Sequence, residues 1–332
     1  MMGACDIRTT RQYAQGSHPQ DSLVTSQLFE QHNKCDDQAR RLGIYLAENI
    51  PYATDVDNYT YATQVIQSEA VTEAFRQWRR KWFTDNRRSV GGALVWQLND
   101  CWPTNSWAIV DYYARPKPAY YALKRESQTV TGGIEVIFPW GELSAPRPHS
   151  ALVSGSACFQ IYGSNLTTKP RKVKLDVAAW DTFADAPYEP FKLKDASAVS
   201  TLEPNGSTVV AEVVLPPLGM YGPAHPKLVV KAHIKDAESG EILARIVNWA
   251  QPLKFHHLLD PKLDIKVSGD KATITCQRPA KCVWLDVTED EELLPWSDNG
   301  FDLYPGDELT VSAAGLKGRV PTVRWLGDHI KV

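Results

Sequence analysis

The stretch at residues 91–102, GGALVWQLNDCW, constrains the fold of this chain more than any other. It begins with two glycines, continues through a short apolar run to Trp96, and becomes polar at Asn99 and Asp100. A short apolar run with its polar groups at the carboxyl tip is typical of a fully buried parallel strand. Pro103 prevents a helix from starting directly afterwards. We therefore expect a buried strand here, and in barrels of alternating strands and helices such strand tips carry the chemistry.

Two helical patterns precede this expected strand. Residues 36–49 place apolar side chains at three- and four-residue steps, and Pro51 ends the pattern. A second apolar stripe starts at Asp57, continues to about Phe83, and finishes in a basic cluster that suits the negative end of a helix dipole. This cluster is interpreted as a solvated helix end rather than as an anion site. Two long helices before one buried strand predict the last units of a (β/α)8 barrel over residues 1–126.

From residue 127 the apolar pattern changes from helical to alternating. Short alternating runs, such as those around Val173 and Val209, are separated by Gly, Pro, Asn and Asp. Strands at this spacing predict an immunoglobulin-like β-sandwich over residues 127–258. Further short strands predict a second, smaller immunoglobulin-like sandwich over residues 259–332, which would depend on packing against its neighbour. The expected fold class is α/β plus all-β: part of a TIM barrel followed by two β-sandwiches.

The same stretches resemble a known enzyme family. The segment WQLNDCWP, continued by SWAIVDYYARPKPAYYALKR, is similar to the last barrel strand and following helix of the retaining β-mannosidases of glycoside hydrolase family two. The upstream segment HNKCDDQARRLGIYL resembles the fungal B-type members, and SDNGFDLYPGDELTV resembles their terminal sandwich domain. These matches occur in the family's order and cover most of the chain. The resemblance implies a hydrolase of carbohydrate metabolism that releases terminal β-linked mannose from non-reducing ends of β-mannosides and manno-oligosaccharides.

By this resemblance, the chain carries part of a sugar-binding wall. Trp96 is expected to pack against the terminal mannose. Asn99 and Asp100 are expected to hydrogen-bond ring hydroxyls or to orient their neighbours. Trp102 is expected to line the entrance, and His32 to border the same site. A structural role is the alternative for each of these residues, and for His32 a solvated loop position is the favoured interpretation.

The catalytic carboxyl groups of such an enzyme are not evident in the chain. A retaining glycosidase needs two, one as nucleophile and one as acid/base. In family two, these belong to a Ser-Glu-aromatic-Gly segment and to an Asn-Glu pair. The chain has no Asn-Glu dipeptide, and its one Ser-Glu, at Ser68 and Glu69, lies inside a helical pattern. By resemblance, Met2 and Gly3 follow the nucleophile segment, so both catalytic glutamates are expected upstream, no catalytic residue is assigned here, and the chain alone is expected to be inactive.

Composition limits the partners of the chain. Its net charge of -3 gives no electrostatic footprint for nucleic acid or an acidic membrane. No apolar run approaches the ~20 residues that span a bilayer, and no metal, nucleotide or flavin motif is visible, so no cofactor is expected. The six cysteines are scattered, which favours thiols in a reducing compartment over disulfides. Together with the B-type resemblance, this predicts a cytoplasmic location, while the oligomeric state stays open.

Two alternatives to a β-mannosidase remain. The first is another family-two exo-glycosidase of the β-galactosidase, β-glucuronidase or exo-glucosaminidase type, although WQLND together with SDNGFDL favours the mannosidase. The second is a non-catalytic carbohydrate-binding or interaction module made of the two sandwiches. The 11 tryptophans would suit stacking on sugar rings. However, Trp140, Trp180, Trp249 and Trp284 fall in expected strands or at their ends, where core packing is the commoner role.

Overall fold

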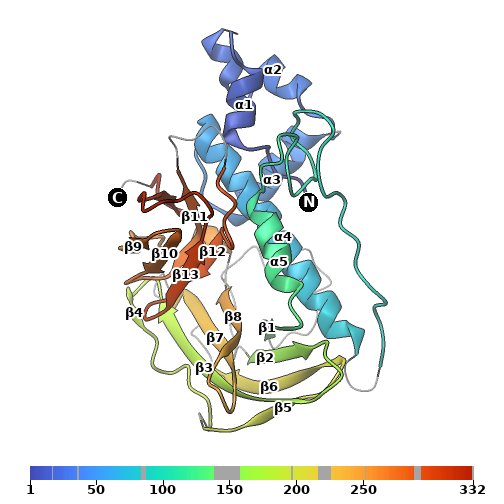
Figure 1. The fold of residues 1–332 in the computed structure, drawn as a ribbon, viewed down its shortest axis with the longest axis vertical. Helices are drawn as coiled ribbons and strands as arrows, with labels where there is room; N and C mark the ends of the chain where they lie inside the picture. The colour runs from blue at the N-terminus through green and yellow to red at the C-terminus, as the bar shows by residue number, and fades with distance from the viewer. Residues whose placement is uncertain are drawn as a thin grey trace. The chain divides into compact units, whose positions relative to one another are not determined.

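A computed structural model describes residues 1–16, 18–35, 37–83, 87–137, 158–195, 197–215, 226–250, 252–287 and 293–330. The chain forms two compact units, whose elements are labelled in Figure 1, and each unit joins segments that are far apart in sequence. Unit 1 consists of Met1–Ala74, Leu94–Arg125 and Leu258–Val332. Unit 2 consists of Phe75–Ala93 and Glu126–His257.

The helices follow the apolar patterns of the sequence. Their bounds are α1 (Ile7–Tyr13), the 3-10 helix η1 (Pro19–Ser22), α2 (Gln27–Gln31), α3 (Gln38–Asn49), α4 (Val56–Trp82) and α5 (Pro118–Glu126). The two predicted helical patterns before residue 91 are confirmed as α3 and α4. Leu42 and Leu46, one turn apart on α3, lie in the core of unit 1. The α4 residues up to Ala74 belong to unit 1, and those from Phe75 onward belong to unit 2.

The C-terminal strands of unit 1 form two small antiparallel sheets. They are β9 (Asp264–Ser268), β10 (Lys271–Thr275), β11 (Ala280–Asp286), β12 (Phe301–Leu303), β13 (Glu308–Ser312) and β14 (Thr322–Arg324), in the orders β13-β10-β9 and β12-β11-β14. The buried Lys281 of β11 lies 2.6 Å from the carboxylate of Glu69 and 2.8 Å from that of Asp302. Glu69, which lies inside α4 as its helical pattern predicted, is therefore held in an ion pair with Lys281. Trp284 packs edge-on against Tyr121 of α5, with ring centroids 5.9 Å apart.

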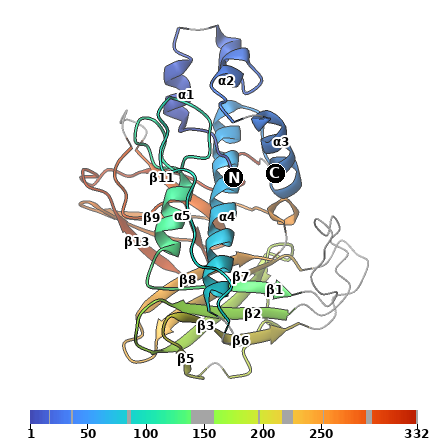
Figure 2. The same cartoon turned by 90° about the vertical axis from the view of Figure 1, so that its right-hand side faces the viewer.

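Unit 2 is a β-sandwich of two antiparallel sheets. Its strands are β1 (Val130–Ile137), β2 (Cys158–Asn165), β3 (Arg171–Asp181), β4 (Ala186–Pro187), β5 (Ser200–Leu202), β6 (Gly206–Val214), β7 (Leu228–Asp236) and β8 (Ile242–Trp249), followed by the 3-10 helix η2 (Leu253–Phe255). One sheet has β2 between β1 and β6 (Figure 2). The other has the order β4-β3-β7-β8, with β5 also paired to β3. Ile161, Val173, Leu202 and Ile234 are fully buried in the core, so the alternating pattern of the sequence is confirmed.

The β7–β8 hairpin shows how local chemistry sets the turn in unit 2. Asp236 accepts hydrogen bonds from the backbone N–H groups of Glu238 and Ser239, at 3.0 and 2.9 Å. Gly240 has a φ of +74°, a left-handed conformation that glycine adopts at no steric cost. The predicted turn at residues 238–240 is confirmed. Of the tryptophans expected to pack in strands, Trp180 and Trp249 are half-buried and Trp284 is buried, whereas Trp140 lies outside the described residues.

The basic end of α4 packs against the sandwich of unit 2. Arg76 pairs with Glu126 at 2.8 Å, and Arg79 donates to the backbone carbonyl of Gln128 at 2.7 Å. Arg80 pairs with Glu135, and its guanidinium lies 4.8 Å from the ring centroid of Tyr162. The interpretation of this cluster as a solvated helix end is wrong for Arg76 and Arg80, because both arginines are held by carboxylates and are largely buried.

The predicted buried strand at residues 91–102 is not formed. Leu94 is 96% exposed and Trp96 is 75% exposed. A strand needs a neighbouring strand to satisfy its backbone groups. Within the described ranges, this stretch meets a neighbour only at its end, where the carbonyls of Gln97 and Leu98 accept hydrogen bonds from the N–H groups of residues 109 and 110, at 3.1 and 2.9 Å. The described fold is thus mostly β-sheet with a few helices, and a barrel of parallel strands is not seen in the described ranges.

Candidate functional site

The five predicted site residues lie in unit 1, four on the loop after residue 94 and His32 at the end of α2. Two isolated parallel bridges support this loop. One joins Asn99 to Val110 and the other joins Asn33 to Asn105. The second bridge fixes the chain just after His32 beside the chain just after Trp102, so that sequence positions about seventy residues apart become neighbours.

Asp100 is the most enclosed of the predicted site residues, at 3% exposure. Its Oδ1 accepts hydrogen bonds from the Ser106 hydroxyl at 2.6 Å and from the Gln97 amide at 3.4 Å. Its Oδ2 makes no hydrogen bond with any described residue. Burial raises the pKa of the Asp100 carboxyl, and the Ser106 hydroxyl and the charge of Lys117 oppose this rise. The side chain therefore offers one acceptor oxygen that the described protein does not use.

His32 and Trp102 come together in an aromatic cluster. The His32 ring stacks on Tyr13 with ring centroids 3.7 Å apart, and it lies 4.3 Å from the ring of Trp102. Its Nδ1 lies 2.5 Å from the carbonyl oxygen of Pro103, and because a carbonyl only accepts, Nδ1 carries the proton. His32 is buried, so the expected solvated loop position is wrong. Lys34 extends over the other ring of the cluster, with its Nζ 5.3 Å from the Trp102 centroid.

Trp96 and Asn99 are exposed. The indole of Trp96 makes no hydrogen bond or ring contact with any described residue. The Asn99 side chain donates to the backbone carbonyl of Asp100 at 3.2 Å. The structure therefore joins His32 with Trp102 and encloses Asp100, whereas Trp96 and Asn99 project from the loop.

Sequence reasoning missed a buried charged centre next to Asp100. Lys117 is 1% exposed, and its ammonium group donates to the carbonyl of Gly3 at 3.0 Å. Burial lowers its pKa, and the charges of Asp100 and Asp111 oppose this fall. Asp111 accepts hydrogen bonds from the Thr9 hydroxyl and from two backbone N–H groups of the following turn. The available signal was an aspartate, Asp111, that follows an apolar run, and a lysine, Lys117, between the two prolines at the start of α5.

This arrangement can bind polar groups. Asp100 and Asp111 are both tied into the fold by donors, so neither stands as a free nucleophile beside a proton donor. In the described part of the chain, no three His, Cys, Asp or Glu side chains gather as they would around a metal ion. All six cysteines fall in described ranges and none forms a disulfide, as the sequence predicted.

Known families match both sandwich regions. Residues 158–254 match the family described as a mannosidase Ig/CBM-like domain. Residues 258–322 match the family described as an Ig-fold domain, of the type found in mannosidases.

Curated relatives extend the similarity to nearly the whole chain. β-Mannosidase B of Thermothelomyces thermophilus is 37% identical over 319 residues, which covers 94% of this chain and 36% of the relative. β-Mannosidase B of Aspergillus terreus is 37% identical over 316 residues, covering 92% of this chain and 35% of the relative. The chain thus spans about a third of the length of the curated relatives it matches.

Solved structures share the fold. The β-D-mannosidase of Dictyoglomus thermophilum superposes with a TM-score of 0.74 at 22% identity, covering 98% of this chain and 36% of that one. The exo-chitosanase of Amycolatopsis orientalis gives a TM-score of 0.59 at 16% identity, with 98% and 40% covered. The chain is thus similar in sequence to the β-mannosidases over 94% of its length, both of its sandwich regions match mannosidase domain families, and it matches about a third of such an enzyme.

Proposed function

We propose that this chain is the C-terminal part of a retaining β-mannosidase. In this proposal, residues 1–126 complete a (β/α)8 barrel, and residues 127–258 and 259–332 are two immunoglobulin-like sandwiches that follow it. The observation that carries the proposal is the 37% identity to a β-mannosidase B across 94% of the chain. The substrates would be β-mannosides with a terminal non-reducing mannose.

The exposed loop supports an incomplete barrel. Leu94, Trp96 and Leu98 are all exposed and are spaced two residues apart, which is the spacing of one face of a strand. Exposed large apolar side chains in a row are typical of a surface that another protein element or a ligand covers. In the complete enzyme, residues 91–98 would pair with neighbouring barrel strands, and the tip at Asn99 and Asp100 would then face the sugar.

The proposed chemistry divides between this chain and the region upstream. Both catalytic glutamates would come from upstream, because the sequence has neither an Asn-Glu pair nor a Ser-Glu followed by an aromatic residue and glycine. This chain would supply binding. Trp96 would stack on the mannose ring, and the unused Oδ2 of Asp100 would accept a hydrogen bond from a ring hydroxyl. The His32–Trp102 cluster would form the wall behind them.

A turnover assay tests whether the catalytic residues lie upstream and the binding residues lie in this chain. The 332-residue chain is incubated with p-nitrophenyl β-mannoside, and no release of nitrophenol above that of an unrelated protein is expected. The same chain fused in frame to the upstream coding region of its own locus should hydrolyse the substrate. Turnover by the chain alone would overturn the proposed upstream position of the catalytic pair.

Substitutions in the fused enzyme test the binding role. Trp96→Ala should lower kcat/KM by about a hundredfold, because a stacked aromatic ring is lost from the sugar site. Trp78→Ala, which removes another exposed tryptophan, on α4, is the matched control and should leave kcat/KM unchanged. The fused enzyme is also tested with aryl β-galactoside, β-glucuronide and β-glucosaminide, the substrates of the alternative exo-glycosidases. A higher kcat/KM for any of these than for the β-mannoside would overturn the mannosidase assignment.

We also propose that the protein acts in the cytoplasm, on the basis of its resemblance to the B-type enzymes. In the ranges that the structure describes, none of the helices combines the length and the apolar character that a bilayer crossing requires. Fractionation of the source cells, followed with an antibody to the chain, tests the location: recovery in the culture medium would overturn it.

A further inference from the structure

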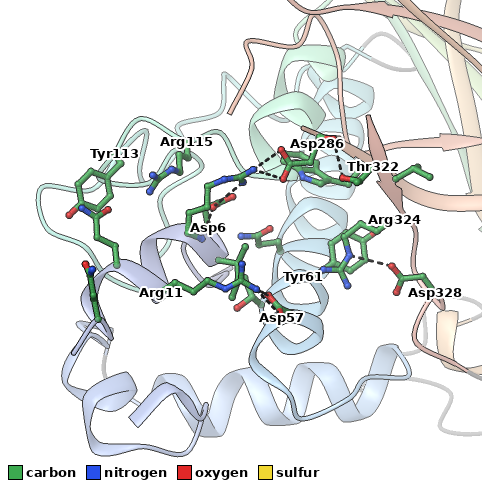
Figure 3. A pocket seen from close by; sticks show the side chains of 18 residues that line it. Asp6, Arg11, Asp57, Tyr61, Tyr113, Arg115, Asp286, Thr322, Arg324 and Asp328 are labelled. Atoms are coloured by element: carbon green, nitrogen blue, oxygen red, sulfur yellow. Dashed lines mark hydrogen bonds and ion pairs between the residues drawn. The ribbon is translucent and has the colours of Figure 1, made fainter. Parts of the chain in front are cut away.

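A cleft of about 950 Å³ opens in unit 1, and Figure 3 shows the side chains that line it. Its walls come from α1, from the first turns of α4, from the ends of β11 and β14, and from Tyr113 and Arg115, which precede α5. The volume is comparable to that of pockets that hold small organic ligands, roughly 300–1,000 Å³. None of the five residues predicted for the mannose site lines it.

The charged side chains of the cleft balance each other. Four arginines and four aspartates line it, so its formal charge is zero. Arg8 makes two hydrogen bonds of 2.7 Å to the carboxylate of Asp286, and Arg11 makes two of 3.0 Å to Asp57. Figure 3 shows Arg11 beside Asp57 and Arg324 beside Asp328 at separate places along the walls. A single anion that approached Arg8, Arg11 or Arg324 would therefore meet an aspartate beside it.

Paired arginines and aspartates place hydrogen-bond donors and acceptors side by side. A guanidinium only donates and a carboxylate only accepts. A ligand that matches such walls must both accept and donate at neighbouring positions, which a hydroxyl group does with one oxygen. Five neutral polar side chains, among them Gln12 and Thr322, also line the cleft. The chemistry favours a neutral ligand that carries many hydroxyl groups.

One buried polar atom among the residues that line the cleft strengthens this conclusion. The Thr60 hydroxyl makes no hydrogen bond with any described residue, whereas Arg324 Nε and Asp328 Oδ2 form an ion pair of 3.4 Å. Thr60 is 3% exposed, so bulk water does not compensate for the missing bond. Buried polar atoms without partners are uncommon in folded proteins and require an explanation. A ligand hydroxyl can donate to or accept from the Thr60 hydroxyl, and would supply the missing hydrogen bond.

We propose that this cleft is a carbohydrate-binding site for a neutral oligosaccharide, distinct from the mannose site proposed above. The Arg11–Asp57 pair at its rim, 64% and 46% exposed, would contact the ligand first. The Arg324–Asp328 pair, with an Nε–Oδ2 distance of 3.4 Å, would bind it at the inner end. Tyr113, which is partly exposed, would give one face of the ligand an aromatic contact.

Calorimetric titration of the complete 332-residue chain with β-1,4-mannotriose tests the proposal. Binding heat is expected with the native chain and with Trp96→Ala, since Trp96 lies outside the cleft. Asp57→Ala and Asp328→Asn should each weaken binding about tenfold or more, the loss expected when a charged hydrogen-bond partner is removed. Asp195→Asn, an exposed aspartate of unit 2, is the matched control and should bind like the native chain. Circular dichroism confirms that each variant is folded.

The outcomes separate this site from the mannose site. Binding that Trp96→Ala abolishes and Asp57→Ala leaves intact would overturn the cleft proposal while supporting the mannose site. Absence of heat with the native chain would overturn the cleft proposal alone, because the activity of the fused enzyme is measured separately. Titration with inorganic phosphate should give no heat, and phosphate binding that depends on Arg11 would show an anion site instead and overturn the proposal.

Discussion

Asp100 is a buried carboxyl group whose pKa is raised from its ordinary value of 3.8 by burial. In the unfolded chain it titrates near 3.8. Between 3.8 and the raised pKa, the folded chain binds more protons than the unfolded chain. This one group therefore makes the free energy of unfolding fall as the pH rises. Asp100→Asn removes the titration. We expect the free energy of unfolding of the variant, relative to the native chain, to rise with pH across that window, by at most about 1.4 kcal/mol per pH unit.

Urea unfolding of both proteins from about pH 3 to about pH 7 measures this difference. Asp236→Asn is the control of opposite sign. Backbone N–H groups of Ser239 and Glu238 lower the pKa of Asp236, so its ionised form stabilises the folded chain above 3.8 and that stability is lost as the pH falls. The relative stability of this control should therefore fall as the pH rises. A pH-independent difference for Asp100→Asn would contradict the buried, ionisable role.

For single residues, the sequence predicted which positions belong to the candidate site better than it predicted their burial and their contacts. The resemblance selected Asp100 and Trp102. It could not show that Lys117 is buried and donates to the carbonyl of Gly3, because that contact depends on a fold that joins the chain's start to residue 117. His32 was expected at a solvated loop position, and it is buried. Its burial comes from Tyr13 and Trp102, one of which is seventy residues away. Contacts between distant residues leave no local signal.

At the scale of elements, periodicity predicted what a segment forms with its own side chains. It gave α3, α4 and the strands of unit 2, where alternate residues face one core. It failed at residues 91–102, because an apolar run forms a strand only when neighbours accept its backbone hydrogen bonds. Leu94 and Trp96 are apolar, as the residues of a buried strand are, but in this chain they are exposed.

The attachment of α1 to β11 can be tested by a double-mutant cycle. Arg8 of α1 and Asp286 of β11 form a bidentate pair, with side chains 14% and 17% exposed. Arg11 and Asp57 have the same residue types and the same bidentate geometry, but are 64% and 46% exposed. We expect a coupling free energy of about 1.5–3 kcal/mol for the enclosed pair and of less than about 1 kcal/mol for the exposed pair, where water screens the charges.

Urea unfolding of the single and double alanine variants of both pairs gives the two coupling energies. Because the pairs share chemistry and differ in burial, each serves as the control for the other. Equal coupling energies would contradict the assigned role of burial. The pair Arg8–Asp286 joins residues 278 positions apart, so no pattern within a sequence window could have predicted it.

At the scale of the whole molecule, the sequence predicted three consecutive regions, whereas the compact units combine distant segments. Unit 1 includes both the first 74 residues and the last 75, from Leu258 to Val332. The change in the period of the apolar pattern at residue 127 indicates where helices end and strands begin. It does not indicate which strands pack on the helices. For that reason, composition and period placed the elements in order without assembling them.

This assembly predicts how a shortened chain behaves. Removal of residues 258–332 deletes the Cys282 carbonyl that accepts the Tyr61 hydroxyl at 2.5 Å, the Trp284 ring that packs on Tyr121, and the carboxylate of Asp286. Tyr61 and Tyr121, both buried in the complete chain, would then face water. In hydrogen exchange, the amides of α1, α3 and α5 should exchange at least about tenfold faster in the chain 1–257 than in the complete chain.

The strands β1 to β8 are the internal control, because unit 2 keeps its own core and their protection should be unchanged. Unchanged protection of α1 and α5 would mean that the helices of unit 1 are stable without the C-terminal sheets, and that the contacts to Cys282, Trp284 and Asp286 contribute little to holding the unit together.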